Sequence, residues 1–154
     1  MAIIMRLTTK GKYAVTALLD LSLNQQSSNY ISVSEIATRR AMPLAYLEQL
    51  FRNLRKAGIV KALRGPNGGY RLSRHSSEIS VSEVVLAVEE RMDATQCGGT
   101  SDCFSGSKCL AHDLWSELNN QVDSFLISKS LEDVIGKDRK NHSKLGDDLI
   151  AAIK

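Results

Sequence analysis

Apolar residues in the first half of the chain follow helical spacing in three successive segments. The first segment covers about residues 9–24. The second begins at Ser32-Val-Ser-Glu35, which has the form of a capping box. The third covers about residues 43–57, with a proline suited to a helix start, and stops at Gly58, which suits a left-handed C-cap. These patterns predict three short helices in a row.

Beyond Gly58 the pattern becomes that of a β-hairpin. Residues 59–63 and 70–72 have strand character, and the segment between them is rich in glycine with one proline and one asparagine. Ser80-Val-Ser-Glu83 is a second capping-box sequence and predicts a fourth helix to about Glu90. Three helices followed by a hairpin is the element order of a winged helix-turn-helix domain.

The second half of the chain predicts one long helix that begins near Leu110. It carries an apolar stripe that packs either within the chain or against a second copy, and its length beyond the winged domain favours a dimer. The expected dimerisation residues are Leu114, Leu118, Val122, Phe125 and Leu126. One or two helical turns are expected at 131–135, and the polar chain from Gly136 onward predicts a mobile tail.

We therefore expect a mainly α-helical fold with one small β-hairpin. Residues 1–90 are assigned to the winged helix-turn-helix domain, 91–112 to a cysteine-rich loop, 113–135 to a dimerisation helix with its following turn, and 136–154 to the tail. The chain has no run of eighteen apolar residues, and its first residues lack the features of a signal peptide, so we expect a cytoplasmic protein with no membrane partner.

Charge divides the 154-residue chain into a basic and an acidic half. Residues 1–74 carry 12 Lys/Arg against 3 Asp/Glu, a net charge of +9, whereas residues 75–154 carry 8 against 14, a net charge of −6. A basic run is often only a solvated face, and winged helices also bind proteins. Together with the element order, however, the asymmetry favours a module that binds double-stranded DNA.

The third helix presents a polar face suited to the DNA major groove. At about 100° per residue, five apolar side chains are expected to face the core: Leu44, Leu47, Leu50, Phe51 and Leu54. Gln49 can pair with adenine, and Arg52 with guanine or phosphate. Glu48 repels phosphate and is tolerated where it accepts from a cytosine amino group, which makes it a candidate selectivity residue. The expected DNA contacts on this helix are Tyr46, Glu48, Gln49, Arg52 and Lys56.

The hairpin adds basic residues at positions where a wing contacts DNA. Arg64 lies at the tip and can enter a minor groove, while Gly65 allows close approach of the backbone. Arg71 on the return strand is a further expected contact.

All three cysteines of the chain lie within thirteen residues and are followed by a histidine. Five residues separate Cys97 from Cys103, five separate Cys103 from Cys109, and two separate Cys109 from His112. Thiolate and imidazole are ligands for iron–sulfur clusters, zinc and copper. Zinc sites usually pair ligands two to four residues apart, so this spacing favours a cluster over a structural zinc ion, with unliganded thiol sensors as the third alternative.

The cysteine loop does not have the composition of an enzyme site. No general base accompanies the cysteines, and a centre that used all four ligands would keep no open position for a substrate. We therefore expect no catalytic residues.

Four segments together resemble the IscR family of bacterial iron–sulfur cluster regulators, which belong to the winged-helix repressors. These segments are Met5-Arg-Leu-Thr-Thr-Lys-Gly-Lys-Tyr-Ala14, Tyr46-Leu-Glu-Gln-Leu-Phe51, Arg64-Gly-Pro-Asn-Gly-Gly-Tyr70 and the run from Asp93 to His112. The resemblance extends from about Met5 to Ile135, and the ligand run is its specific part.

The resemblance implies a homodimeric transcription factor that binds a palindromic operator. It implies a [2Fe–2S] cluster on Cys97, Cys103, Cys109 and His112, delivered by the iron–sulfur assembly machinery. It also implies that the cluster-bound form represses cluster-assembly genes, that the cluster-free form binds a second class of site, and that Glu48 is the selectivity residue.

Two departures from the family pattern bear on these expectations. Pro43 and Ala45 stand where the recognition helices of the family carry serines, which predicts a shifted operator preference. Met1–Ile4 precede the resembling segment, so Met5 is an alternative start. A nitric-oxide-sensing repressor of the same family and a zinc-stabilised winged-helix regulator are the alternative functions, and the Cys-Leu-Ala-His112 run argues against the first.

Overall fold

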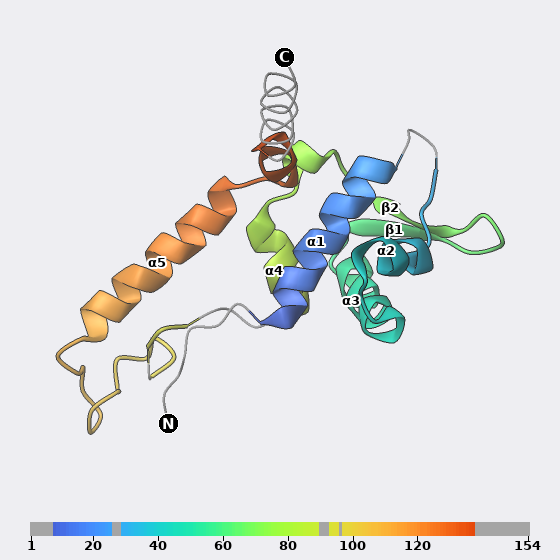
Figure 1. Ribbon diagram of the computed structural model, residues 1–154. Helices are drawn as coiled ribbons and strands as arrows, with labels where there is room; N and C mark the ends of the chain where they lie inside the picture. The colour runs from blue at the N-terminus through green and yellow to red at the C-terminus, as the bar shows by residue number, and fades with distance from the viewer. Residues whose placement is uncertain (1–7, 26–28, 90–92, 96, 138–154) are drawn as a thin grey trace, which may run out of the picture.

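The structure is a computed structural model that describes residues 8–25, 29–89, 93–95 and 97–137. Its elements are α1 (Thr9–Asn24), α2 (Val33–Arg40), α3 (Leu44–Lys56), β1 (Val60–Leu63), β2 (Gly69–Leu72), a 3₁₀ turn η1 (Ser76–Glu78), α4 (Val81–Val88) and α5 (His112–Ser128). In Figure 1, α1 crosses the centre beside α4, with α2, α3 and the hairpin on one side and α5 on the other. This order confirms the predicted winged helix-turn-helix domain with a long helix after it.

Local signals place the helix ends where the sequence predicts them. Ser32 and Glu35 form a reciprocal capping box at α2, and Ser80 and Glu83 form another at α4. Each pair satisfies two backbone N–H groups that a helix start otherwise leaves without partners. Gly58, which follows α3, has a φ of 75°, a left-handed conformation that glycine adopts without steric cost.

The hairpin forms the wing and is joined to the rest of the domain through Ile31. Val60 pairs with Leu72 and Leu63 with Gly69 in an antiparallel register. Ile31 and Tyr70 exchange backbone hydrogen bonds of 2.9 and 2.8 Å, which add a third extended segment beside β2. A Cβ atom on Gly69 would lie 2.3 Å from the Ile31 carbonyl oxygen, so this close approach requires glycine.

The core of the winged domain takes in a segment from the far end of the chain. Side chains of α1 to α4 and the hairpin bury one apolar cluster, which includes Leu18, Phe51 and Val84. Residues 131–137 form a helical segment whose Leu131 is completely buried in the same cluster. The Leu131 N–H donates to the Ile79 carbonyl (3.0 Å), so this end of the chain returns to the start of α4.

An ion-paired aspartate joins α1 to α2. Asp20 is completely buried in α1, and its carboxylate lies 2.6 Å from Arg39 Nη2 and 2.6 Å from Arg40 Nε. Both arginines lie in the last turn of α2, and their side chains are only partly exposed. A buried carboxylate needs such partners, because an unpaired charge in the core is strongly destabilising.

Several expectations from the sequence differ from the structure. The fourth helix ends at Val88 rather than near Glu90. Leu44 is 42% exposed rather than buried, because α3 begins there and the wing leaves that position open. The helical segment that begins at 131 continues through Gly136, where the tail was expected to begin; the rest of that tail and Met1–Met5 lie outside the described residues. Within the described chain, no helix has the length and apolar character needed to cross a membrane.

Candidate metal centre and DNA-binding surface

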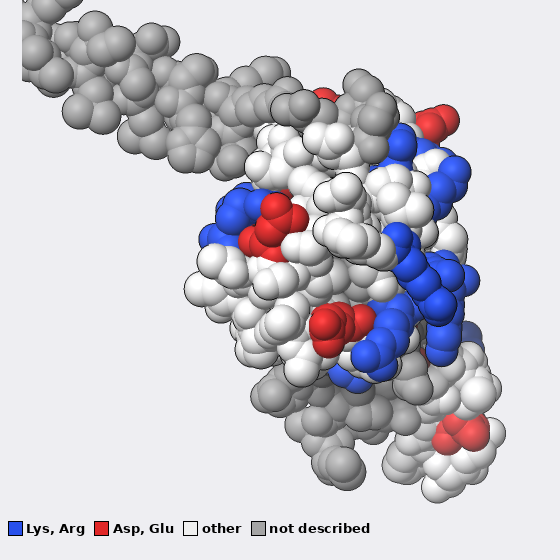
Figure 2. All heavy atoms as spheres, turned by 90° about the vertical axis from the view of Figure 1, so that its right-hand side faces the viewer, with Lys and Arg blue, Asp and Glu red and all other residues white. Residues whose placement is uncertain are grey.

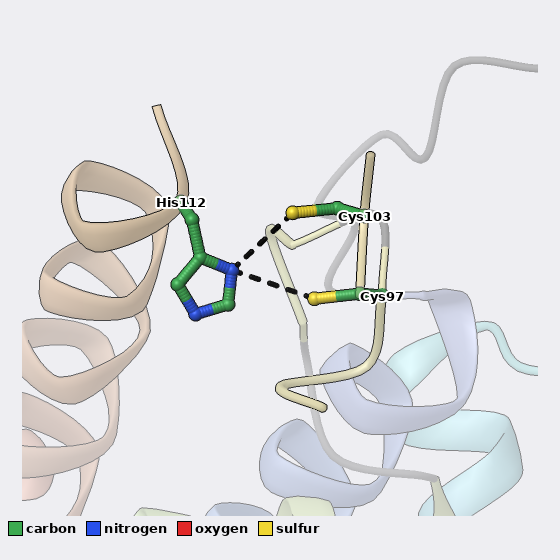
Figure 3. Close-up of side chains that lie close together, drawn as sticks. All are labelled: Cys97, Cys103 and His112. Atoms are coloured by element: carbon green, nitrogen blue, oxygen red, sulfur yellow. Dashed lines mark hydrogen bonds between the residues drawn. The ribbon is translucent and has the colours of Figure 1, made fainter. Parts of the chain in front are cut away.

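Two of the cysteines and the histidine converge on one point at the start of α5. Ligand atoms of Cys97, Cys103 and His112 all lie within 4.8 Å of one another. The Nδ1 atom of His112 is 3.5 Å from each of the two sulfur atoms. Figure 3 marks both contacts with dashed lines. His112 is the first residue of α5 and is 5% exposed, so the helix holds the ring while the loop brings in the sulfurs.

The third cysteine lies beside this group. The Cys109 backbone N–H donates to the Cys103 sulfur at 3.1 Å, but the Cys109 sulfur is not one of the atoms within the 4.8 Å group. Three of the four predicted ligands are therefore together, and the fourth is adjacent to them.

The loop backbone surrounds Cys97 with hydrogen-bond donors. Gly98 and Gly99 have φ values of 63° and 86°, and these turn the chain so that nearby N–H groups point back at the sulfur. Desolvation raises the pKa of Cys97, but hydrogen bonds to its sulfur, first from the N–H groups of Ser101 and Gly99, outweigh it and lower the pKa to about 6. Cys97 is therefore mainly a thiolate at neutral pH, the form that binds metals.

Cys103 has the opposite tendency. The Cys109 N–H lowers its pKa, but desolvation and the neighbouring thiols Cys109 and Cys97 outweigh that effect, so the pKa is raised. Two close sulfurs resist carrying negative charge together unless a cation lies between them. The donor set thus fits a soft cationic centre.

A polar face of α5 holds the loop in place. Asn119 donates from Nδ2 to Asp93 Oδ1 (2.7 Å) and accepts from the Ala94 N–H at its own Oδ1 (2.7 Å). Thr95 donates its hydroxyl proton to the same Asp93 oxygen and accepts from the Gly99 N–H (3.0 Å). Asn119 thus fastens the first residues of the loop to the helix that also carries His112.

The predicted dimerisation residues lie on a different face of α5 and are open to solvent. Leu114, Leu118 and Phe125 are 59%, 37% and 60% exposed, and Val122 and Leu126 are partly buried. Within α5 only His112 is buried. Three of these five side chains are therefore largely exposed in the single chain, and none belongs to its apolar core.

The predicted DNA contacts of α3 are mostly exposed. Glu48, Gln49, Arg52 and Lys56 all face solvent. Gln49 Oε1 accepts a hydrogen bond from Arg52 Nη1 (3.3 Å). Glu48 and Arg52 also line a groove of about 420 Å³ between α3 and the wing, with Gly65 on its far side. A ligand in this groove would therefore lie against both the Glu48 carboxylate and the Arg52 guanidinium.

Two of the expected DNA contacts pack against other side chains. The Tyr46 ring lies edge-on to Tyr13 at 5.7 Å, and burial together with the charge of Glu89 raises its pKa. The Arg71 guanidinium lies 5.8 Å from the centre of the Tyr30 ring and is partly buried. Both side chains therefore pack within the domain, and each is only partly exposed.

The wing carries the exposed basic tip that the sequence predicts. Arg64 and Gly65 are exposed at the turn, and Lys61 is exposed on β1. Figure 2 shows most Lys and Arg side chains gathered in a band along one side of the face from which the wing projects, while the fewer acidic side chains lie in small groups, two of them directly beside basic ones. This face has the charge needed to contact phosphates.

We compared the chain with known protein families and solved structures. Residues 7–137 match the family described as Rrf2, iron-dependent transcriptional regulator. The chain belongs to the Rrf2 family.

Relatives within Rrf2 include regulators named IscR. The chain is 51% identical over 122 residues to IscR of Vibrio atlanticus (79% of this chain, 70% of the relative), and 49% identical over 131 residues to IscR of Photorhabdus laumondii (85% and 79%). Among solved structures, T. potens IscR matches with a TM-score of 0.71 and 29% identity (90% of this chain, 91% of that chain). CymR, the global cysteine regulator of B. subtilis, also has a TM-score of 0.71, with 28% identity (87% and 98%).

Membership of Rrf2 confirms the predicted winged-helix fold, the resemblance to IscR and the assignment as a transcriptional regulator rather than an enzyme. Sequence reasoning missed residues that support the site from a distance. Asn119 gives no local signal, and Glu89 is one of several acidic residues near the loop. Glu89 accepts hydrogen bonds from the Thr8 hydroxyl and the Gly11 N–H, so it caps α1 from the end of α4.

Proposed function

We propose that this Rrf2 protein is a homodimeric DNA-binding regulator whose choice of operator depends on a [2Fe–2S] cluster. The observation that carries the proposal is the convergence of Cys97, Cys103 and His112 at the start of α5, in a chain whose other half is a winged helix-turn-helix domain. Cys109, adjacent to Cys103, completes the proposed ligand set.

The donor set suits such a cluster. Three thiolates with one imidazole are soft to borderline ligands, and one of the thiols already has a pKa of about 6. When bound, the cluster supplies an occupancy and an oxidation state that follow iron supply, sulfide supply and oxidants. The assembly machinery that makes clusters is the proposed donor, and cytoplasmic DNA is the proposed target.

The chain offers a physical route from the site to the DNA-binding domain. Asn119 ties the loop to α5, and the end of α5 returns through Leu131 to the core beneath α4. On the other side of the loop, Glu89 at the end of α4 caps the start of α1. Cluster binding that orders the loop would therefore act on the domain through two connections, α5 with Leu131 and Glu89 with α1. A difference in domain geometry between the loaded and the cluster-free protein is what coupling to DNA affinity requires.

The exposed stripe of α5 supports the proposed homodimer. Leu114, Leu118 and Phe125 lie in one row along the helix and are exposed in the single chain. Pairing this row with a second copy would bury it and fix the spacing of two recognition helices, which suits a palindromic operator.

Within each half-site, we assign roles by chemistry and position. Gln49, Arg52 and Lys56 contact bases and phosphates from α3, and Arg64 with Gly65 contacts the minor groove from the wing. Glu48 selects between operator classes, because its carboxylate is costly wherever it does not find a donor on a base edge. Arg71 and Tyr46 contribute mainly through the packing described above. Cluster-bound protein represses the genes of cluster assembly.

Anaerobic purification followed by iron, sulfide and zinc analysis tests the cofactor. We expect two iron and two sulfide per chain, with a visible spectrum that disappears in a His112→Ala or Cys109→Ala variant. Stoichiometric zinc without iron or sulfide would favour a zinc-stabilised regulator, and a spectrum that responds only to nitric oxide would favour a nitric-oxide sensor.

Operator binding tests the DNA roles. We expect Glu48→Ala to bind both operator classes alike, and His112→Ala to bind only the class that the cluster-free protein recognises. If both variants bound every site as the unsubstituted protein does, the selectivity and gating assignments would be wrong.

A further inference from the structure

The two ring nitrogens of His112 face different chemical groups. Nδ1 lies 3.5 Å from the sulfurs of Cys97 and Cys103, and Figure 3 shows the second ring nitrogen turned away from both. That nitrogen, Nε2, lies 3.2 Å from Ser101 Oγ and 3.3 Å from Ser116 Oγ. The ring is almost completely buried, so these two hydroxyls stand where water would otherwise solvate Nε2.

The serines come from the two elements that form the site. Ser116 lies four residues after His112 on α5, so both side chains share one face of the helix. Ser101 lies in the loop, and its own N–H group is among the donors to the Cys97 sulfur. Ser101 therefore touches a proposed sulfur ligand through its backbone and the proposed nitrogen ligand through its side chain.

We propose that Ser116 and Ser101 are positioning residues that assign Nδ1 of His112 to the metal centre and limit how tightly the histidine is held. This inference rests on the proposed function and deepens it. A metal-bound Nδ1 carries no proton, so Nε2 keeps the ring proton and donates it to a serine oxygen. Metal-bound histidines commonly donate to a carboxylate or a carbonyl, which increases their basicity. An uncharged hydroxyl is a weaker acceptor, and it leaves the histidine easier to release.

The backbone of Ser101 supports the importance of its hydroxyl. Its φ of 64° lies in the left-handed region, which costs a serine energy and suits glycine. Gly98 and Gly99 in the same loop adopt that region without the cost. A serine at this position is therefore conformationally less favourable than glycine, but it places a hydroxyl on His112. A Ser101→Gly substitution therefore removes the contact while relieving the backbone.

The test compares variants at position 116 that change only the acceptor. Ser116→Ala removes one of the two hydroxyls at Nε2, Ser116→Thr keeps it and Ser116→Asp replaces it by a carboxylate. We expect the half-time of cluster loss to a chelator to shorten about 10-fold in Ser116→Ala and in Ser101→Gly, to be restored in Ser116→Thr, and to lengthen in Ser116→Asp. The reduction potential is expected to become more negative in Ser116→Asp and less negative in Ser116→Ala.

A matched control separates charge from contact. Ser124 is exposed on the same helix, so Ser124→Asp adds the same charge away from His112 and is expected to leave both measurements unchanged. Equal loss rates and equal potentials in Ser116→Ala, Ser116→Asp and the unsubstituted protein would overturn the proposal.

A second probe keeps this test independent of the cluster. Co²⁺ added to the metal-free protein reports ligation through its visible spectrum. We expect the Co²⁺ affinity to be lowest in Ser116→Ala and Ser101→Gly, intermediate in Ser116→Thr and the unsubstituted protein, and highest in Ser116→Asp. If the purified protein holds no cluster, yet the Co²⁺ affinities follow that order, the cluster proposal fails while the roles of the two serines stand. Identical Co²⁺ affinities would overturn the serine roles whatever the native metal.

Discussion

The side-chain amide of Asn119 lies 2.7 Å from Oδ1 of Asp93 and joins the start of the cysteine-rich loop to α5. The two residues are 26 positions apart in the chain. Because the same amide also accepts from the Ala94 N–H, one side chain holds two consecutive loop residues.

Replacing Asn119 by Ala is expected to loosen this attachment. Loss of two hydrogen bonds of about 1 kcal/mol each leaves loop order less dependent on α5. We expect the ratio of DNA affinities between loaded and metal-free protein to fall toward one, measured by fluorescence anisotropy on one operator. Asn120 is exposed on the same helix, and Asn120→Ala serves as the matched control. An unchanged ratio in Asn119→Ala would remove this contact from the coupling route.

The buried carboxylate of Asp20 makes a second prediction, on stability. Asp20→Ala leaves Arg39 and Arg40 without their shared partner, and the loss of its charge-assisted hydrogen bonds costs about 1.5–3 kcal/mol, since both arginines are partly exposed and keep some solvation. We expect the free energy of unfolding in urea to fall by roughly that amount. Asp123, only partly buried in α5, provides the comparison, and Asp123→Ala is expected to cost less. A loss below about 0.5 kcal/mol for Asp20→Ala, the range of ordinary surface changes, would contradict this account.

Gly69 is expected to be intolerant of any side chain. A Cβ atom there would lie 2.3 Å from the Ile31 carbonyl oxygen, and its φ of 150° is unfavourable for other residues. Gly69→Ala should shift the wing away from Ile31 and weaken operator binding. Gly58→Ala has an unfavourable φ as well, but nothing lies within 4 Å of its Cβ, so it separates backbone strain from the clash. Equal binding by both variants would show that the contact with Ile31 does not position the wing.

Arg64 at the wing tip is expected to contribute through charge. If it contacts a phosphate or the narrow minor groove, Arg64→Ala weakens binding to all operators and reduces the slope of log affinity against log salt by about 1. Titrations between low and physiological salt measure that slope. Lys10, exposed at the start of α1, is the control for a general change in net charge. Similar slopes for Arg64→Ala and the unsubstituted protein would remove this residue from the interface.

The capping box of α2 predicts a pH dependence of stability. The Ser32 backbone N–H, followed by the Ser32 hydroxyl, holds the pKa of Glu35 below its usual value. The unfolded chain therefore binds this proton more readily than the folded one, so the stabilisation is present above the unfolded pKa and is lost as pH falls through the folded pKa. Urea unfolding at pH values from 6 down to 3.5 should show a shallower loss of stability in Glu35→Gln. Glu117→Gln, exposed on α5, is the control and should keep the original slope.

Much of the fold follows from consecutive residues. Capping boxes at Ser32 and Ser80, helical spacing and the glycine-rich turn are local signals, because each depends on residues within a few positions of one another. The spacing of cysteines and histidine is likewise local, and it identified three residues that the structure brings together and a fourth beside them.

The supporting contacts could be decided only by the path of the whole chain. Thr8 and Glu89 are 81 residues apart, and no local pattern predicts that Glu89 accepts hydrogen bonds at the start of α1. Leu131 was expected in one or two helical turns after the long helix, and only the tertiary structure shows that its side chain lies in the core of the winged domain, with its N–H bonded to the Ile79 carbonyl. The sequence predicted Tyr46 and Arg71 as DNA contacts. In the structure, Tyr46 packs against the Tyr13 ring and Arg71 lies over the Tyr30 ring.

The same division applies to His112. The sequence determined that an imidazole follows the cysteines at a spacing that permits ligation. Which nitrogen faces the sulfurs and which groups hold the other one were decided by the packing of α5 against the loop, since either ring nitrogen can bind a metal and the hydrogen bond made by the other decides which one does.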